Sequence, residues 1–98
     1  MPGSENSTGK FHYVYVLESI IKSGELYIGC TENLVKRFRE HNTGLNFSTK
    51  PYRPWKLIHY ESYRSEKDVS RREKYLKTSQ GSRLLGRMLK EYFYSRKR

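Results

Sequence analysis

The sequence predicts an α+β domain in which a small three-stranded, mainly antiparallel sheet is flanked by three helices. The first observation is the length of 98 residues, which suits one domain with a modest core. The second is the order of the segments: strand, strand, helix, strand, helix, helix. The third is composition, because the strand segments are rich in aromatic and β-branched residues and the helix segments repeat apolar residues at helical spacing.

The first half of the chain predicts a hairpin followed by a helix. Residues 11–19 (FHYVYVLES) read as a strand, and residues 25–31 (ELYIGCT) read as its antiparallel partner after a short turn. Thr31 is a candidate N-cap for a helix over residues 33–41. The turn residues that end at Gly44 should stop this helix.

The second half predicts a loop, a third strand and two further helices. Residues 45–54 carry Asn, Ser, Thr and two prolines, which are typical of a surface loop. Residues 55–63 (WKLIHYESY) form the third strand, and residues 65–78 form a helix that opens with a capping-box sequence. Gly81 should break the chain before a last amphipathic helix over residues 82–94.

Charge and composition limit the classes of partner. The 20 lysines and arginines exceed the 10 acidic residues, so the formal net charge is +10. This surplus favours a polyanion such as DNA or RNA. No apolar run is long enough to span a membrane, which predicts a soluble, cytoplasmic protein without a membrane partner. The lone Cys30 predicts neither an intramolecular disulfide nor a zinc site.

The sequence also predicts the domain boundaries. The polar residues 1–10 resemble a disordered arm or an expression remnant, residues 11–94 form the domain, and residues 95–98 are a basic tail.

Glu73 breaks the apolar pattern of its helix. Val69, Glu73 and Leu76 share one helix face, so a carboxylate interrupts an apolar stripe. A buried charge needs a cation, hydrogen-bond donors or a metal ion. The pattern leaves two readings open: an ion pair with Arg71, Arg72 or another nearby base, and a metal-binding or catalytic role.

Arg37 and His41 lie four residues apart on the predicted first helix, along the edge of its apolar stripe. We expect them to form a cationic ridge beside the core. Arginine offers a planar set of donors suited to phosphate, and histidine can orient or protonate a reacting group. Two polar residues on a solvated helix flank are the alternative interpretation.

Tyrosines occupy both strands of the hairpin. Tyr13 and Tyr15 point to one face of the first strand, and Tyr27 lies on the second just before Gly29. Cross-strand aromatic packing would explain them without any chemistry. A tyrosine acts as a base near neutral pH only if a cation such as Arg37 or a metal ion favours its phenolate. Gly29 allows close approach of a phosphate or of packed atoms.

These residues together resemble the GIY-YIG nuclease family across most of the chain. Tyr27-Ile28-Gly29 matches the second half of the family motif, and Tyr13-Val14-Tyr15 stands where the first half has Gly-Ile-Tyr. Arg37, His41 and Glu73 follow in the family's order. The likeness is strongest to the short stand-alone members, which are similar to the nuclease domain of the excision-repair incision protein. The missing glycine before Val14 is a departure from the motif.

The resemblance implies a metal-dependent DNA endonuclease of low sequence specificity that acts in repair or recombination. It implies one Mg²⁺ or Mn²⁺ ion held by Glu73, the scissile phosphate and water. Arg37 would neutralise charge on the phosphate, and Tyr15 or Tyr27, aided by His41, would position or deprotonate the attacking water. The products would carry 5′-phosphate and 3′-hydroxyl ends.

DNA is the expected partner, RNA is a second candidate, and the oligomeric state stays open. When bound to DNA, the protein would associate with the nucleoid. The residues expected to contact nucleic acid are Gly29, Lys36, Arg39, Lys50 and Arg53. Two rival functions are a non-catalytic nucleic-acid-binding module with the same fold, and a basic protein-interaction domain in which Glu73 forms a buried ion pair.

Overall fold

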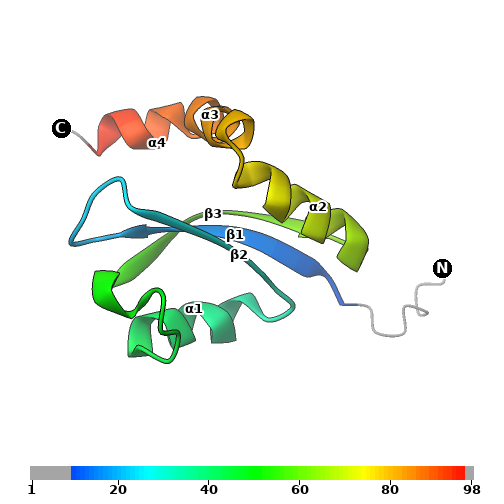
Figure 1. Ribbon diagram of the computed structural model, residues 1–98, viewed down its shortest axis with the longest axis horizontal. Helices are drawn as coiled ribbons and strands as arrows, with labels where there is room; N and C mark the ends of the chain where they lie inside the picture. The colour runs from blue at the N-terminus through cyan, green and yellow to red at the C-terminus, as the bar shows by residue number, and fades with distance from the viewer. Residues whose placement is uncertain (1–9, 97–98) are drawn as a thin grey trace.

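A three-stranded antiparallel sheet forms the centre of the molecule in the computed structural model, which describes residues 10–96. The strands are β1 (His12–Ser19), β2 (Leu26–Thr31) and β3 (Trp55–Tyr63), in the spatial order β2-β1-β3 (Figure 1). The helices are α1 (Leu34–Thr43), the short 3₁₀ helix η2 (Lys50–Tyr52), α2 (Glu66–Leu76), α3 (Ser79–Met88) and α4 (Lys90–Ser95). The predicted α+β class is confirmed. Most of the predicted N-terminal arm, and residues 97–98 of the predicted tail, lie outside the described range.

Helices cover both faces of this sheet. The side chains of the central strand β1 alternate between the two faces and are buried on both. Val14 and Val16 pack under α2 and α3, whereas Tyr15 and Leu17 pack toward α1. All four are fully buried. Figure 1 shows the two layers, with α1 on one side of the sheet and α2 to α4 on the other. Within residues 10–96, no helix is long and apolar enough to cross a membrane.

A β-bulge in β3 changes which face its side chains occupy. The pairing of β1 with β3 shifts between Val16 and Leu17, so that Leu17 pairs with Leu57 and Val16 with His59. Before the shift, Trp55 and Leu57 pack in the cluster under α1. After the shift, the residues of β3 that pair with Val16 and Val14, which are His59 and Glu61, lie on the face toward α2.

The start of α1 differs from the sequence-based expectation. The helix begins at Leu34, and its N-cap is Asn33, whose side chain accepts a hydrogen bond from the Lys36 backbone N–H. The expected N-cap, Thr31, instead accepts from the backbone N–H of Asn33. The helix ends as expected at Gly44, which adopts φ +86°.

The expected break at Gly81 is wrong. Helix α3 starts at Ser79, and its N-cap Thr78 accepts a hydrogen bond from the Gly81 backbone N–H. Gly81 is buried, and a Cβ at this position would lie 2.0 Å from the Tyr75 carbonyl oxygen. The glycine therefore permits close contact between α2 and α3. The single last helix expected over residues 82–94 is also wrong, because the backbone leaves helical geometry at Leu89 and α4 begins after it.

Candidate active site

Tyr15 and Gly29 pair directly across β1 and β2. A Cβ at position 29 would lie 2.6 Å from the Tyr15 hydroxyl oxygen and 3.0 Å from Cε2 of Tyr27. Only a glycine leaves room for both phenols at this point. The close approach expected at Gly29 is therefore made by the two tyrosines.

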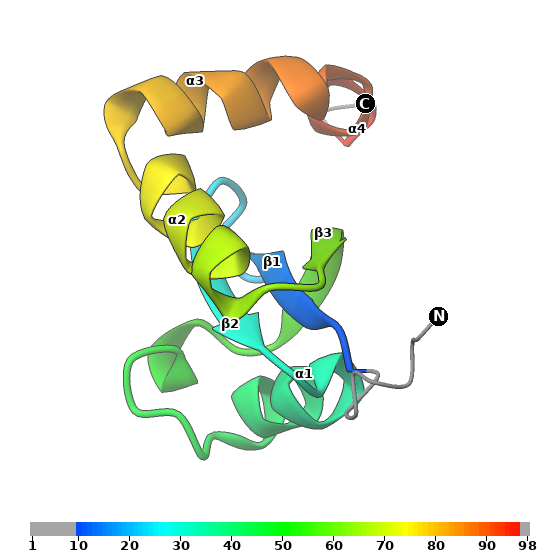
Figure 2. The ribbon, with the colours of Figure 1, turned by 90° about the vertical axis from the view of Figure 1, so that its right-hand side faces the viewer.

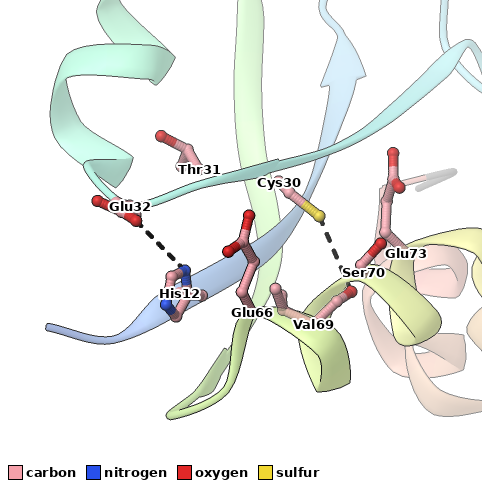
Figure 3. A pocket seen from close by; sticks show the side chains of 8 residues that line it. All are labelled: His12, Cys30, Thr31, Glu32, Glu66, Val69, Ser70 and Glu73. Carbon is pink, nitrogen blue, oxygen red and sulfur yellow. Dashed lines mark hydrogen bonds and ion pairs between the residues drawn. The ribbon is translucent and has the colours of Figure 1, made fainter.

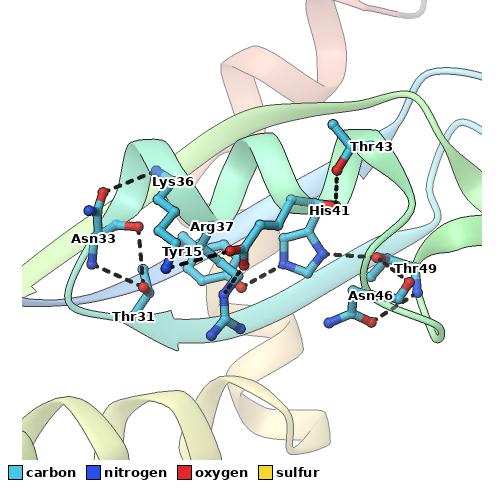
Figure 4. A network of polar contacts seen from close by, with 10 residues as sticks. Tyr15, Thr31, Asn33, Lys36, Arg37, His41, Thr43, Asn46 and Thr49 are labelled. Carbon is cyan, nitrogen blue, oxygen red and sulfur yellow. Dashed lines mark hydrogen bonds and ion pairs between the residues drawn. The ribbon is translucent and has the colours of Figure 1, made fainter.

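A hydrogen-bonded series runs from Tyr15 through α1 into the following loop (Figure 4). The Tyr15 hydroxyl lies 2.7 Å from His41 Nε2, and His41 Nδ1 lies 2.9 Å from the Thr49 hydroxyl oxygen. Thr49 donates its own proton to the Asn46 carbonyl at 3.3 Å. Thr49 must then accept from His41 Nδ1–H, which leaves Nε2 as the acceptor for the Tyr15 proton.

Burial sets the charge of this series. Tyr15 and His41 are both inaccessible to solvent. Burial, and then the nearby Arg37, lower the pKa of His41. Burial also raises the pKa of Tyr15, and Tyr27 adds to the rise, while Arg37 opposes it through its charge and a hydrogen bond to the Tyr15 oxygen. Near neutral pH the series is therefore a protonated phenol beside a neutral imidazole.

The expected cationic ridge is thus wrong at His41, which lies inside the core. The helix turns its side chain toward the sheet, so desolvation removes the charge that a surface histidine could carry. Arg37 stays at the surface, with 39% of its side chain exposed, and pairs with Glu40 at 3.3 Å.

Tyr27 is the phenol that borders solvent. It is half-buried, and its ring packs against His41 with centroids 4.8 Å apart and against Tyr15 at 6.2 Å. The two tyrosines therefore differ in environment: Tyr15 is sealed against His41 and Arg37, and Tyr27 lies nearer the surface.

Glu73 lies on α2 between the buried residues Val69 and Leu76, as the stripe predicts. Its side chain is 20% exposed and forms an ion pair with Lys77, one turn further along, at 2.5 Å. The two arginines considered as partners from the sequence bind other carboxylates. Glu73 is therefore paired with a lysine whose side chain is 52% exposed.

Lys77 lies near both Glu73 and Tyr27. The hydrogen bond to Glu73 raises the pKa of Lys77, and Tyr27 and Cys30 lie close enough to act on it electrostatically. Burial and then the charge of Glu73 raise the pKa of Cys30 on β2. Glu73 thus faces β2 from the α2 side, while Tyr15 and His41 lie on the α1 side of the same strand.

A cavity of about 300 Å³ lies between α2 and the ends of β1 and β2 (Figure 3). Its lining residues are His12, Cys30, Thr31, Glu32, Glu66, Val69, Ser70 and Glu73. No group of three His, Cys, Asp or Glu side chains within residues 10–96 is placed to hold a metal ion. Glu73 offers carboxylate oxygens beside open space, which fits an ion that keeps most of its water and takes oxygens from a phosphate.

The basic residues expected to hold DNA lie on α1 and on the loop after it. Arg39 and Lys50 are exposed, and Lys36 lies 3.8 Å from Glu40. Arg53 folds over the end of α1, since a Cβ at Gly44 would lie 2.7 Å from its guanidinium. The exposed ion pair of Lys36 with Glu40 is weak, so Lys36 can turn to a phosphate at little cost.

Three residues of the site did not stand out in the sequence. Asn46 and Thr49 lie in an irregular polar loop, where no periodicity shows which side chains turn inward. Lys77 could have been found from its i+4 spacing to Glu73, which places two opposite charges on one helix face.

The comparisons with known proteins agree with this arrangement. Residues 11–85 match the family of the GIY-YIG catalytic domain. The chain therefore belongs to the GIY-YIG family, which is a family of endonucleases.

Two short relatives match most of the chain. A UPF0213 protein from Syntrophus aciditrophicus is 44% identical over 68 residues, which cover 67% of this chain and 76% of the relative. A UPF0213 protein from Bacillus licheniformis is 34% identical over 88 residues, or 89% and 82% of the two chains. The structure-specific endonuclease subunit SLX1 of Vanderwaltozyma polyspora is 41% identical over 54 residues, which are 49% of this chain and 17% of that protein.

Proposed function

We propose that this protein is a divalent-metal-dependent DNA endonuclease that hydrolyses phosphodiester bonds with low sequence specificity. Family membership supports nuclease chemistry. The observation that carries the proposal is the oriented series Tyr15–His41–Thr49, which lies against Arg37 and across β2 from Glu73. A purely structural buried cluster would not need a surface arginine whose charge favours ionisation of the phenol.

The orientation of the hydrogen bonds suits the removal of a proton from water. Arg37 lies close enough to the Tyr15 oxygen to favour its ionised form. In this proposal, the turn of Arg37 to the scissile phosphate opens the buried Tyr15 oxygen to the attacking water. The oxygen then accepts a proton from that water while its own proton passes to His41 Nε2. The resulting hydroxide attacks phosphorus, the bond to the 3′ oxygen breaks, and that oxygen takes up a proton from water. This leaves a 5′-phosphate and a 3′-hydroxyl.

The remaining residues have positioning and electrostatic roles in this proposal. Thr49 fixes the His41 tautomer, because it accepts from Nδ1–H. Tyr27 borders solvent next to His41 and would hold the attacking water in line. Arg37 would neutralise charge on the phosphate oxygens. Among the two phenols, we therefore assign proton transfer to Tyr15 and water positioning to Tyr27.

Glu73 would hold the metal ion. Mg²⁺ or Mn²⁺, when bound, stabilises negative charge on the departing oxygen. Lys77 neutralises the Glu73 carboxylate in the ion-free protein. Because Lys77 is half-exposed, it can release Glu73 to the ion and swing toward solvent or a phosphate.

The charge of the protein supports DNA as the substrate, with phosphate contacts from Lys36, Arg39, Lys50 and Arg53 and little contact with base edges. A role in DNA repair or recombination is part of this proposal, and the likeness to SLX1, a structure-specific endonuclease subunit, supports its nuclease chemistry. Phosphate contacts of this kind would also make binding strongly dependent on salt.

The decisive experiment measures cleavage of plasmid, branched and single-stranded DNA with Mg²⁺ or Mn²⁺. Glu73→Gln and Arg37→Ala should each abolish cleavage and keep the melting temperature within a few degrees of the wild type. Glu91→Gln, on exposed α4, changes the net charge by the same amount as Glu73→Gln and should cleave like the wild type.

Three outcomes contradict the proposal. Equal cleavage by all variants would identify a contaminating enzyme. DNA binding without cleavage under any metal condition would favour the non-catalytic module. Unfolding of Glu73→Gln, with no activity in the wild type, would favour a structural ion pair between Glu73 and Lys77.

A further inference from the structure

The loop between α1 and β3, residues 44–54, carries two large apolar side chains that have no role in the core. Phe47 is 90% exposed and Leu45 is 75% exposed, more than any other large apolar residue in the described part of the chain. Single exposed apolar residues are common on protein surfaces. Two that stand within three positions on one loop, beside a candidate active site, need a separate explanation.

This loop is firmly held on both sides of Phe47. The Asn46 side chain accepts hydrogen bonds from the backbone N–H and the hydroxyl of Ser48. Thr49 is buried, and its carbonyl accepts from the Trp55 indole N–H at 2.9 Å. The backbone N–H of Leu45 donates to the Glu40 carbonyl. These anchors fix the backbone around the exposed ring, so Phe47 is presented to solvent by a fixed support.

The anchors also belong to the candidate active site. Thr49 is the hydroxyl that binds His41, and it follows Phe47 by two residues. The loop projects beyond the β2 edge of the sheet and away from β3, on the face that α1 covers (Figure 2). A DNA strand whose phosphate lies between Arg37 and Glu73 would therefore pass close to the loop.

The charges next to the apolar tip match nucleic acid. Lys50 is exposed, Arg53 lies over the start of the loop, and no acidic residue lies between positions 41 and 60. An apolar tip set among cations suits a polyanion whose bases are accessible, because the cations bind the backbone while the ring stacks on a base. Bases in an intact duplex are already stacked on one another.

We propose that Leu45 and Phe47 form a wedge that stacks on an unpaired nucleobase next to the cleaved bond. The preferred substrate is then DNA whose stacking is interrupted, such as a flap, a bulge or a branch. This inference rests on the proposed nuclease function and narrows its substrate class. The alternative occupant of this tip is a protein, such as a second copy of this chain. The test below distinguishes binding of a nucleobase from that alternative.

The test compares binding of a fully paired duplex with binding of a flap of the same sequence. Binding is measured by fluorescence anisotropy in EDTA, so that no cleavage is needed. Phe47→Ala should weaken binding of the flap about tenfold and of the duplex by less than about twofold. Ile21→Ala is the matched control, since Ile21 is an apolar residue of 64% exposure at the turn between β1 and β2. This variant should bind the flap and the duplex as the wild type does.

A second variant tests stacking itself. Phe47→Trp keeps an aromatic ring and should retain flap binding, and its emission should be quenched by the flap but not by the duplex. Trp55 is buried and gives a constant background.

Equal loss of affinity for flap and duplex in Phe47→Ala, or no loss for either, overturns the wedge. So does a self-association of the wild type that disappears in Phe47→Ala while DNA binding is unchanged. Because the assay contains no metal, the wedge can be supported even if the protein proves inactive. It can equally be overturned while cleavage of plasmid persists and depends on Glu73.

Discussion

Replacing Gly29 by alanine tests the candidate active site most directly. The added Cβ would lie 2.6 Å from the Tyr15 hydroxyl oxygen, whereas ordinary contact begins at 3.4 Å. The phenol has no free space, because Tyr15 is fully buried and its oxygen is 2.7 Å from His41. The ring must therefore retreat by several tenths of an ångström, which breaks or bends that hydrogen bond.

The expected magnitudes follow from this clash. Overpacking a buried site costs about 1–3 kcal/mol, and a displacement near 1 Å in a catalytic constellation can lower a rate by about 100-fold. Gly29→Ala should therefore cleave DNA roughly 100-fold more slowly than wild type, with a lower but measurable melting temperature. Initial rates of plasmid nicking and thermal unfolding followed by circular dichroism measure the two effects.

Gly86→Ala is the matched control. No heavy atom lies within 4 Å of the added Cβ, and Gly86 is an exposed residue of α3. Alanine favours a helix over glycine by up to about 1 kcal/mol, so this variant should be as stable as the wild type or more so, and fully active.

Wild-type cleavage and stability in Gly29→Ala would refute the reasoning. If Gly29→Ala is too unstable to assay, adding Tyr15→Phe removes the nearest clashing atom. The double variant should then lose less stability than the two single variants together. Strict additivity would show that the hydroxyl does not cause the clash.

Three further predictions concern charged groups. Burial lowers the pKa of His41, so the stability from its neutral form is complete above its ordinary pKa of 6.5 and is lost as the pH falls below that value; His41→Gln should flatten this part of the curve of melting temperature against pH. Burial of Glu61 opposes its ionisation, but hydrogen bonds from Arg72, His59 and Tyr63 outweigh it and lower the pKa of Glu61 to about 2. The stability from ionised Glu61 should therefore be lost as the pH falls from 4.5 toward 2, and Glu61→Gln should remove that loss while lowering the melting temperature near neutral pH. Lys77→Met should lower the Mn²⁺ concentration required for half-maximal cleavage, because no lysine then competes for Glu73; an unchanged metal requirement would argue against that competition.

Much of the fold could be predicted from local patterns. The third strand has the predicted bounds, Trp55–Tyr63, because a segment rich in aromatic and aliphatic residues lies between clear turn signals. Gly44 ends α1 as expected, since φ +86° favours glycine. The prediction failed where a local signal had a second use: Gly81 looks like a helix breaker, but its missing side chain serves the packing of α2 on α3.

The candidate site was only partly accessible to the same reasoning. Residue types and order pointed to Tyr15, Tyr27, Arg37, His41 and Glu73. Their environments could not be read from spacing. His41 looked like a surface cation, but it lies on the face of α1 that packs against Tyr15 of the sheet, and it is fully buried.

The sequence by itself determined the class of fold, the strongly basic charge, the family and the residues that could do chemistry, because these depend on composition and on periodicity over a few residues. The tertiary structure decided the tautomer of His41, the space that only Gly29 provides and the outward position of Phe47. Each of these depends on atoms brought together from distant parts of the chain. Contacts between residues far apart in the sequence, and the burial that they cause, form only when the chain folds.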